Sequence, residues 1–161
     1  MSDNPISSGI SHDRTPHLAV AGNTALIVWA DNDTNENNIK GRGIRADGTL
    51  LGSIFGFLIS GAPGSQFSPA VAWDGSQYTV TWLDHRNEQF PIQPRGDIYA
   101  ARVGPKGAIL QTFAVANSPA PEETPFVVGA NGVTVFAYSR FYDEAPYSAM
   151  RVTTRALTGA P

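Results

Sequence analysis

Oxygen-bearing side chains alternate in the segment Asp31–Asn38, which reads DNDTNENN. Asp31, Asp33 and Asn35 have the every-second-residue spacing at which a calcium loop supplies its oxygen ligands. The glycine and the later bidentate glutamate of such a loop are missing, because Glu36 stands where the glycine would be. A solvated polar loop with side-chain-capped turns is therefore the favoured interpretation. Calcium at Asp31, Asp33 and Asn35 is retained as the candidate cofactor site.

Two further segments combine charged groups with aromatic rings. The first carries Asp84, His85 and Arg86, and the second carries Phe141 and Tyr142. Aromatic rings beside carboxylates suit recognition of a carbohydrate or a peptide, and they suit a subunit interface equally well. For Asp84 and Arg86 we favour a structural ion pair with the backbone or with Arg102 that fixes a strand end, and for His85 a lone surface histidine. These five residues are the candidate ligand-binding set.

The composition excludes several kinds of chemistry. The 161 residues contain no cysteine, which rules out a disulfide, a thiolate metal site and a cysteine nucleophile. The three histidines are far apart in the sequence and predict no zinc site. No G-x-S-x-G, H-E-x-x-H or glycine-rich phosphate motif occurs, so no catalytic residue is predicted. A net charge of −3 argues against a nucleic-acid partner.

An internal repeat would position these residues. Three segments align without a gap, namely Thr15–Ala30, Ser68–Leu83 and Thr124–Ser139. Each has proline as its second residue and an aromatic residue 13 positions later, and the prolines are 53 and then 56 residues apart. The prolines are Pro16, Pro69 and Pro125, and the aromatic residues are Trp29, Trp82 and Tyr138. A period of this length indicates a propeller or another repeat array.

Each repeat predicts four short strands joined by tight turns. The first turn of each copy contains Gly22-Asn23, Asp74-Gly75 or Asn131-Gly132, pairs that tolerate a positive φ. The second strands, ALIVW and VTVFAY, lack the apolar–polar alternation of a strand covered on one face. We therefore predict an all-β fold, a β-propeller with three four-stranded antiparallel blades per chain. A β-sandwich is the alternative.

The second repeat resembles repeats that are common in large exported bacterial proteins. The residues AVAWDGSQYTVTWLDHR, followed by DIYAARV, carry a W-D-G turn, a W-x-D-x-R strand end and D-I-Y-A-x-R. The match is good over Ser68–Leu110, fair over Thr15–Leu51 and poor after Ser139. Such repeats are regarded as propeller-forming, so the resemblance implies a propeller and an extracytoplasmic or secreted setting. No signal peptide is expected in residues 1–16, and no apolar run approaches the roughly 20 residues of a membrane helix.

The repeat divides the chain into four parts. Residues 1–10 are expected to be an outer strand that completes another blade, and residues 11–62 and 63–119 the first two blades. Residues 120–161 are expected to form a third blade that lacks its outer strand. Since a ring needs about four to eight blades, we predict self-association, with a homodimer closing a six-bladed ring. The remainder of a longer propeller is the alternative.

Function is predicted from the long segments that follow each second strand. On a propeller they share one face, which we expect to be the binding face. The absence of catalytic motifs favours a non-catalytic binding or adhesion module for a glycan, a peptide or a protein surface, and hence no enzyme. A purely structural segment of a larger exported protein is the alternative. A glycoside-hydrolase-like enzyme ranks third, because it needs two converging carboxylates.

Overall fold

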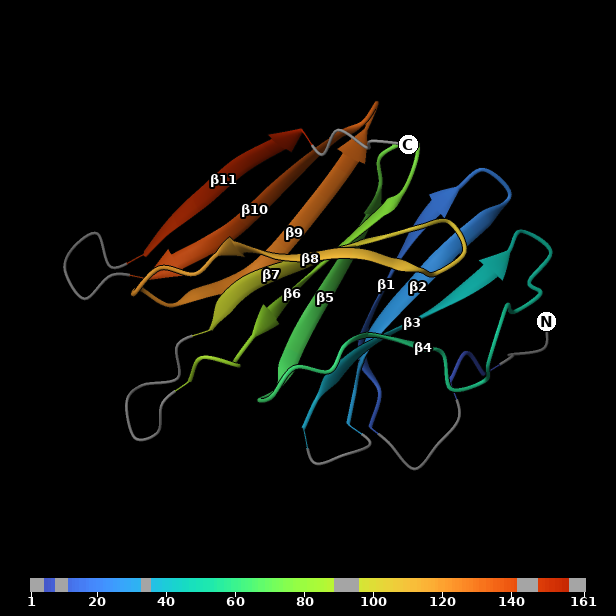
Figure 1. Ribbon diagram of the computed structural model, residues 1–161, viewed down its shortest axis with the longest axis horizontal. Coiled ribbons are helices and arrows are strands. Elements are labelled where there is room, and N and C mark those ends of the chain that lie inside the picture. The colour runs from blue at the N-terminus through green and yellow to red at the C-terminus, as the bar shows by residue number, and fades with distance from the viewer. Residues whose placement is uncertain (1–4, 8–11, 33–35, 89–95, 142–147, 157–161) are drawn as a thin grey trace.

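The computed structural model describes residues 5–7, 12–32, 36–88, 96–141 and 148–156, with backbone only at 148–150 and 153–156. These residues form three antiparallel sheets in chain order, and each sheet comes from one repeat (Figure 1). Blade 1 consists of β1 (Arg14–Ala21), β2 (Thr24–Asp31), β3 (Asn38–Arg45) and β4 (Phe57–Ser60). Blade 2 consists of β5 (Gln66–Trp73), β6 (Tyr78–Asp84), β7 (Asp97–Val103) and β8 (Ile109–Ala116). Blade 3 consists of β9 (Glu122–Ala130), β10 (Val133–Phe141) and β11 (Ser148–Ala156).

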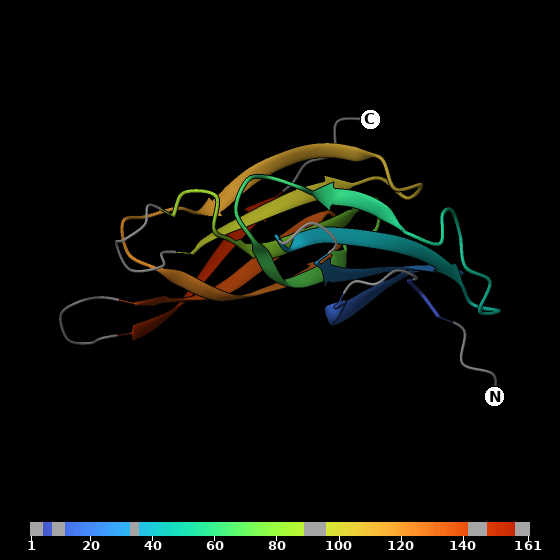
Figure 2. The same cartoon turned by 90° about the horizontal axis from the view of Figure 1, so that it is seen from below.

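The first strands of the three sheets, β1, β5 and β9, lie side by side, and the other strands follow outward in sequence order. Blades 1 and 3 lie on opposite sides of blade 2 in both views (Figures 1 and 2). This is the arrangement of propeller blades around an axis, and the prediction of a propeller is confirmed. The alternative of a β-sandwich is wrong, because three separate sheets fan out where a sandwich has two facing sheets.

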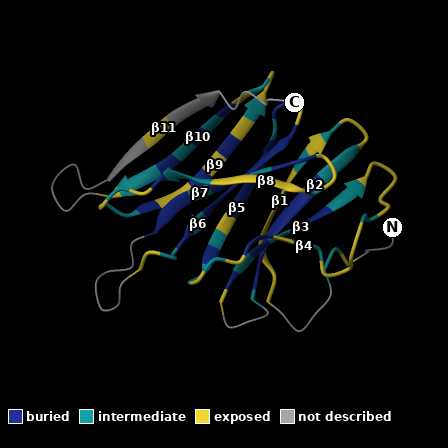
Figure 3. Cartoon of the chain, in the orientation of Figure 1, coloured by how far each residue is buried: buried dark blue, intermediate teal, exposed yellow. Residues whose placement is uncertain are grey.

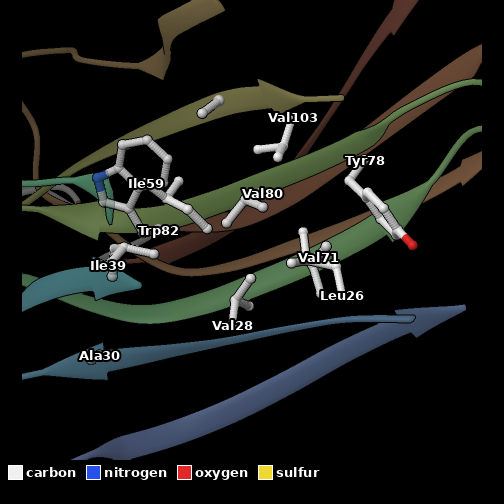
Figure 4. Close-up of a cluster of buried hydrophobic side chains, with 11 residues drawn as sticks. Leu26, Val28, Ala30, Ile39, Ile59, Val71, Tyr78, Val80, Trp82 and Val103 are labelled. Atoms are coloured by element: carbon white, nitrogen blue, oxygen red, sulfur yellow. The ribbon is translucent and has the colours of Figure 1, made fainter. Parts of the chain in front are cut away.

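The blades are held together by apolar side chains from both facing sheets. Between blades 1 and 2 the core contains Leu26, Val28 and Ile39 on one side and Val80 and Trp82 on the other. Figure 4 shows these side chains gathered between the strands of blade 1 and those of blade 2. A second cluster joins blade 2 to blade 3. Blade 2 is therefore covered on both faces.

Backbone hydrogen bonds repeat the same joint at both blade boundaries. The N–H of Gln66, where blade 2 begins, donates to Asn37 O at 2.8 Å, in the loop after β2. The N–H of Glu122, where blade 3 begins, donates to Gly96 O at 2.8 Å, in the loop after β6. Each new blade is thus anchored to the loop of the preceding one.

At the chain's N-terminal end, Pro5–Ser7 lie outside any strand, and Ile6 O accepts a hydrogen bond from Arg42 of blade 1 at 2.7 Å. The predicted outer strand at 1–10 falls mostly outside the described residues, and its pairing with another blade stays a prediction. No helix that could span a membrane is found in the described parts of the chain.

Candidate functional site

Each inner strand carries a bulge at a Thr-Pro or Ser-Pro step. The residues before the prolines, Thr15, Ser68 and Thr124, have φ values of 50°, 48° and 54°. The pairing register shifts at the same points in all three blades. Proline has no N–H to donate to the strand ladder, so a bulge is where a sheet tolerates it. A positive φ at a residue with a side chain stores strain of the order of 1–3 kcal/mol, and such residues cluster at functional sites.

The three bulges meet at one groove. Its volume is about 310 Å³, and it is the place where all three inner strands contribute side chains. It lies at the end of β5 where Gln66 pairs with Asp84, the last residue of β6. The groove therefore opens on the face from which the loops after β2, β6 and β10 leave, the face predicted to bind. Its lining consists of Thr15, Pro16, His17, Ser68, Pro69, Ala70, Leu83, Glu123, Thr124, Pro125 and Phe126.

The groove combines hydroxyl, carboxylate and imidazole groups with apolar walls. The residues Thr15, Ser68 and Thr124 are exposed, and so is Glu123. The Nδ1 atom of His17 accepts a hydrogen bond from the N–H of Val71 at 3.2 Å. With Nδ1 accepting, the proton of the neutral ring sits on Nε2, which becomes a donor. The groove can therefore both donate and accept hydrogen bonds, as binding of a polyhydroxylated ligand requires.

Each repeat also has a polar residue three positions before its proline. These residues are Asp13, Gln66 and Glu122. Gln66 and Glu122 are fully buried. One oxygen of Glu122 accepts hydrogen bonds from Arg140 Nε at 2.9 Å and Ser118 Oγ at 2.5 Å. Its other oxygen, Oε2, and the Oε1 atom of Gln66 have no hydrogen-bond partner among the described residues. Buried polar atoms without a partner are rare in proteins and are costly.

The predicted site residues Asp84 and Arg86 form an internal ion pair. Asp84 is fully buried, and its two oxygens accept from Arg86 Nε at 2.8 Å and Arg86 Nη2 at 2.7 Å. Asp84 also accepts from Trp82 Nε1 at 2.7 Å and from the N–H of Arg86 at 2.9 Å. The guanidinium lies 3.9 Å from the centre of the Tyr99 ring. The ion pair therefore lies at the strand end, as favoured from the sequence, but the side chain that pairs with Asp84 is Arg86 and not the predicted Arg102.

The neighbouring groups on this loop also face one another. His85 Nδ1 lies 2.5 Å from Glu88 Oε1, and the His85 ring packs edge-on against Phe67. Burial raises the pKa of the Asp97 carboxyl, a hydrogen bond from Asn87 opposes that rise, and the nearby Asp84 charge adds to it. Two carboxylates thus end β6 and begin β7 side by side.

The remaining predicted residues are dispersed. Asp31 is buried and pairs with Lys40 Nζ at 3.0 Å; Asp33 and Asn35 lie outside the described residues, so calcium there stays a prediction. Phe141 ends β10 in blade 3, and Tyr142 lies outside the described residues. Within the described part of the chain, no group of three or more His, Cys, Asp or Glu residues could hold a metal ion.

The groove residues were missed at the sequence level, although a signal for them exists. The repeat aligns a Thr or Ser before proline in all three copies, at Thr15, Ser68 and Thr124. The sequence analysis used the prolines to set the register and gave the hydroxyl residues no role. Glu123 and His17 carry no such signal, because neither type recurs at its position in the other repeats.

No protein-family model and no curated protein matches this sequence. Among solved structures, a thermostable family-43 glycoside hydrolase matches with a TM-score of 0.60 at 14% identity, over 91% of this chain and 51% of that one. An endo-arabinase from Bacteroides thetaiotaomicron VPI-5482 matches with a TM-score of 0.59 at 11% identity, over 88% and 55%. A subtype N10 neuraminidase-like protein of A/little yellow-shouldered bat/Guatemala/060/2010 matches with a TM-score of 0.58 at 14% identity, over 94% of this chain and 43% of that one.

At these identities the likeness shows the fold, which is that of a propeller, and this chain spans about half the length of those three chains. The prediction of a non-catalytic binding or adhesion module, with a structural segment as its alternative, is corrected by this comparison. Two of the three structures are glycoside hydrolases, so this fold occurs in enzymes and gives no support to the expectation that the chain is not an enzyme.

Proposed function

We propose that this chain is part of a carbohydrate-active propeller. It binds a glycan in the groove where the three inner strands meet, here called the axial groove, and cleaves a glycosidic bond there. The observation that carries the proposal is the convergence of three strained Thr/Ser-Pro bulges on one groove that also holds Glu123 and His17. The fold shared with a family-43 glycoside hydrolase and an endo-arabinase supports the same class of substrate.

The walls of the groove suit a sugar chain. Sugars present apolar ring faces and a rim of hydroxyl groups, and they need apolar surfaces beside oriented donors and acceptors. The prolines, Leu83 and Phe126 supply the apolar surface, and the hydroxyls of Thr15, Ser68 and Thr124 supply groups that both donate and accept. Because the bulges fix these hydroxyls on rigid strands, little entropy is lost when a ligand binds.

Glu123 is the carboxyl group that we assign to catalysis. Glycoside hydrolysis uses two carboxyl groups: one protonates the leaving oxygen, and the other either activates water or attacks the sugar. Glu123 is the exposed carboxylate among the groove residues. We assign the second carboxyl group to a blade beyond the three described here, on the opposite side of the axis. An extracytoplasmic setting, implied by the W-D-G repeat, belongs to the same proposal.

The test is a substrate screen with the chain in the form it adopts in solution. Purified protein is incubated with neutral polysaccharides, including arabinan, and with sialylated glycans, and both binding and new reducing ends are measured. Glu123→Gln is expected to keep binding and to lose about 10²–10⁴-fold in cleavage rate, the usual contribution of a general acid or base. The control Asp47→Asn, at the exposed turn after β3, is expected to retain the full rate. Cleavage that survives Glu123→Gln, or no binding to any glycan, would overturn the proposal.

A further inference from the structure

The two ends of the blade row expose apolar sheet faces. In blade 3, the exposed fractions of Phe126, Val128 and Val152 are 55%, 63% and 70%. In blade 1, those of Leu18 and Val20 are 56% and 62%. Residues two apart on a strand share a face, and Ala137 pairs with both Phe126 and Val152, so each set forms one patch. Contiguous apolar patches on a soluble protein mark an interaction surface.

The corresponding face of blade 2 shows what packs against such a face. Leu18 in blade 1 corresponds to Val71 in blade 2, and Val71 is buried in the core that packs against blade 1. The exposed face of blade 1 therefore has the position and character of a face that receives a preceding blade. Arg42 and Ile6 lie over its outer part, and β1 is left open.

The opposite face follows the same rule. Phe126 and Val128 in blade 3 correspond to Ala70 and Ala72 in blade 2, which pack against Val127 of blade 3. The exposed face of blade 3 therefore has the position of a face that receives a following blade. The chain thus presents both halves of the blade–blade interface that it already forms twice internally.

We propose that the occupant of both faces is a second copy of this chain, so that two copies close a six-bladed ring. The blade 3 face of each copy packs on the blade 1 face of the other, at two identical junctions. Such a head-to-tail contact closes when its rotation completes a circle, and six blades lie within the usual range of about four to eight. A second copy covers both unlike faces at once, whereas an unrelated partner would need two unlike surfaces of its own.

Closure would also complete the axial groove, since three more inner strands with their Thr/Ser-Pro bulges would face it. The inference nevertheless stands apart from the proposed function. A correct ring without hydrolytic activity would contradict only the function, and a monomer that still binds a glycan in the groove would contradict only the ring.

The first measurement is the molar mass of the 161-residue chain by light scattering after size exclusion. The chain's own mass is 17.1 kDa, and the expected result is twice that value. Leu18→Glu and Val128→Glu each place a charge in both junctions of the ring, so each variant is expected to elute as a monomer. Leu110→Glu is the matched control, because Leu110 is 57% exposed but lies on the outer strand β8, and it is expected to stay dimeric.

A mixing experiment separates this ring from any other dimer and from misfolding. Equimolar Leu18→Glu and Val128→Lys can form a ring in which one junction is wild type and the other pairs the two new charges. The mixture is expected to recover the dimer mass, while each variant alone stays monomeric with an unchanged circular dichroism spectrum. A wild-type monomer, a dimer that survives both substitutions, a mixture that fails to pair, or an open-ended oligomer would each overturn the proposal. If the wild-type chain is a monomer, the two exposed faces are instead covered by further blades of a longer polypeptide.

Discussion

Blades 2 and 3 are built from the same repeat and differ in what lies against them. Along β6 the residues Tyr78 to Trp82 are at most 3% exposed, so both faces of this strand are covered. Along β10 burial alternates: Thr134, Phe136 and Tyr138 are buried, while Val133 is 44% exposed. Figure 3 shows the continuous dark strand in blade 2 and the banded one in blade 3. The residues of β10 do not alternate in polarity, so its sequence fits a strand covered on both faces.

In both blades an ion pair holds the end of the second strand, but the acidic residue lies on the second strand in blade 2 and on the first strand in blade 3. In blade 2, Asp84 ends β6 opposite Gln66 and is held by Arg86. In blade 3 the equivalent residue is Arg140, opposite Glu122, and the two form an ion pair at 2.9 Å. The acid has moved from one strand to its neighbour while a buried carboxylate and an arginine remain paired. Both repeats keep a carboxylate–arginine pair at this place although the acidic residue differs in position, which indicates a structural role for the pair.

The largest effect is expected from breaking this anchor in blade 2. Asp84→Ala leaves Trp82 Nε1 and the Arg86 guanidinium without their acceptor, and removing one partner of a buried ion pair costs about 3–5 kcal/mol. The free energy of unfolding, measured by urea titration, is expected to fall by that amount. Asp47→Ala, at an exposed turn, serves as the control and is expected to change it far less. A loss below about 1 kcal/mol would show that Asp84 is held as weakly as an exposed pair.

An intermediate effect distinguishes a blade covered on both faces from one that is half open. Val80 is fully buried in blade 2, and Val80→Ala is expected to cost about 2 kcal/mol from lost burial and the cavity left behind. Val152 in blade 3 is 70% exposed, and Val152→Ala is expected to stay within about 0.5 kcal/mol at dilute protein. If a second copy covers blade 3, the cost of Val152→Ala will rise with protein concentration, whereas that of Val80→Ala will not. Equal costs at all concentrations would remove the contrast between the blades.

The sequence predicted the architecture well because a repeat samples each structural position three times. The aligned prolines and aromatics placed the inner and second strands. The lack of alternation in ALIVW predicted two-sided burial, which β2 shows, whereas β10, which contains VTVFAY, is covered on one face only. The site was predicted less well, since Asp84 and Arg86 form the most recognisable charged motif and turn out to be paired with each other. The groove depends on three segments more than 50 residues apart meeting at an axis, together with a backbone strain that side-chain types alone do not show.

The smallest effect concerns Asp84 and Asp97, two carboxylates that lie opposite each other in blade 2. At the same place in blade 3, Ala149 lies opposite Arg140. Burial raises the pKa of Asp97 above its ordinary value of 3.8, so the folded state holds this proton to a higher pH than the unfolded chain does. The free energy of unfolding therefore falls as the pH rises from about 4 through the folded-state pKa of this group. Asp97→Asn removes that contribution and can keep the contact with Asn87 through its side-chain oxygen.

Urea titrations at a series of pH values between 4 and 7 are expected to show a smaller decline for Asp97→Asn than for the unaltered chain. At pH 7 the variant is expected to be at least as stable as the unaltered chain. In blade 3, the substitution Ala149→Asn places the same side chain in the same register without removing a carboxylate, so it is the matched control and should leave the pH profile unchanged. A steeper decline for Asp97→Asn would mean that the ionised Asp97 stabilises blade 2, and that the paired acids are a favourable part of its anchor.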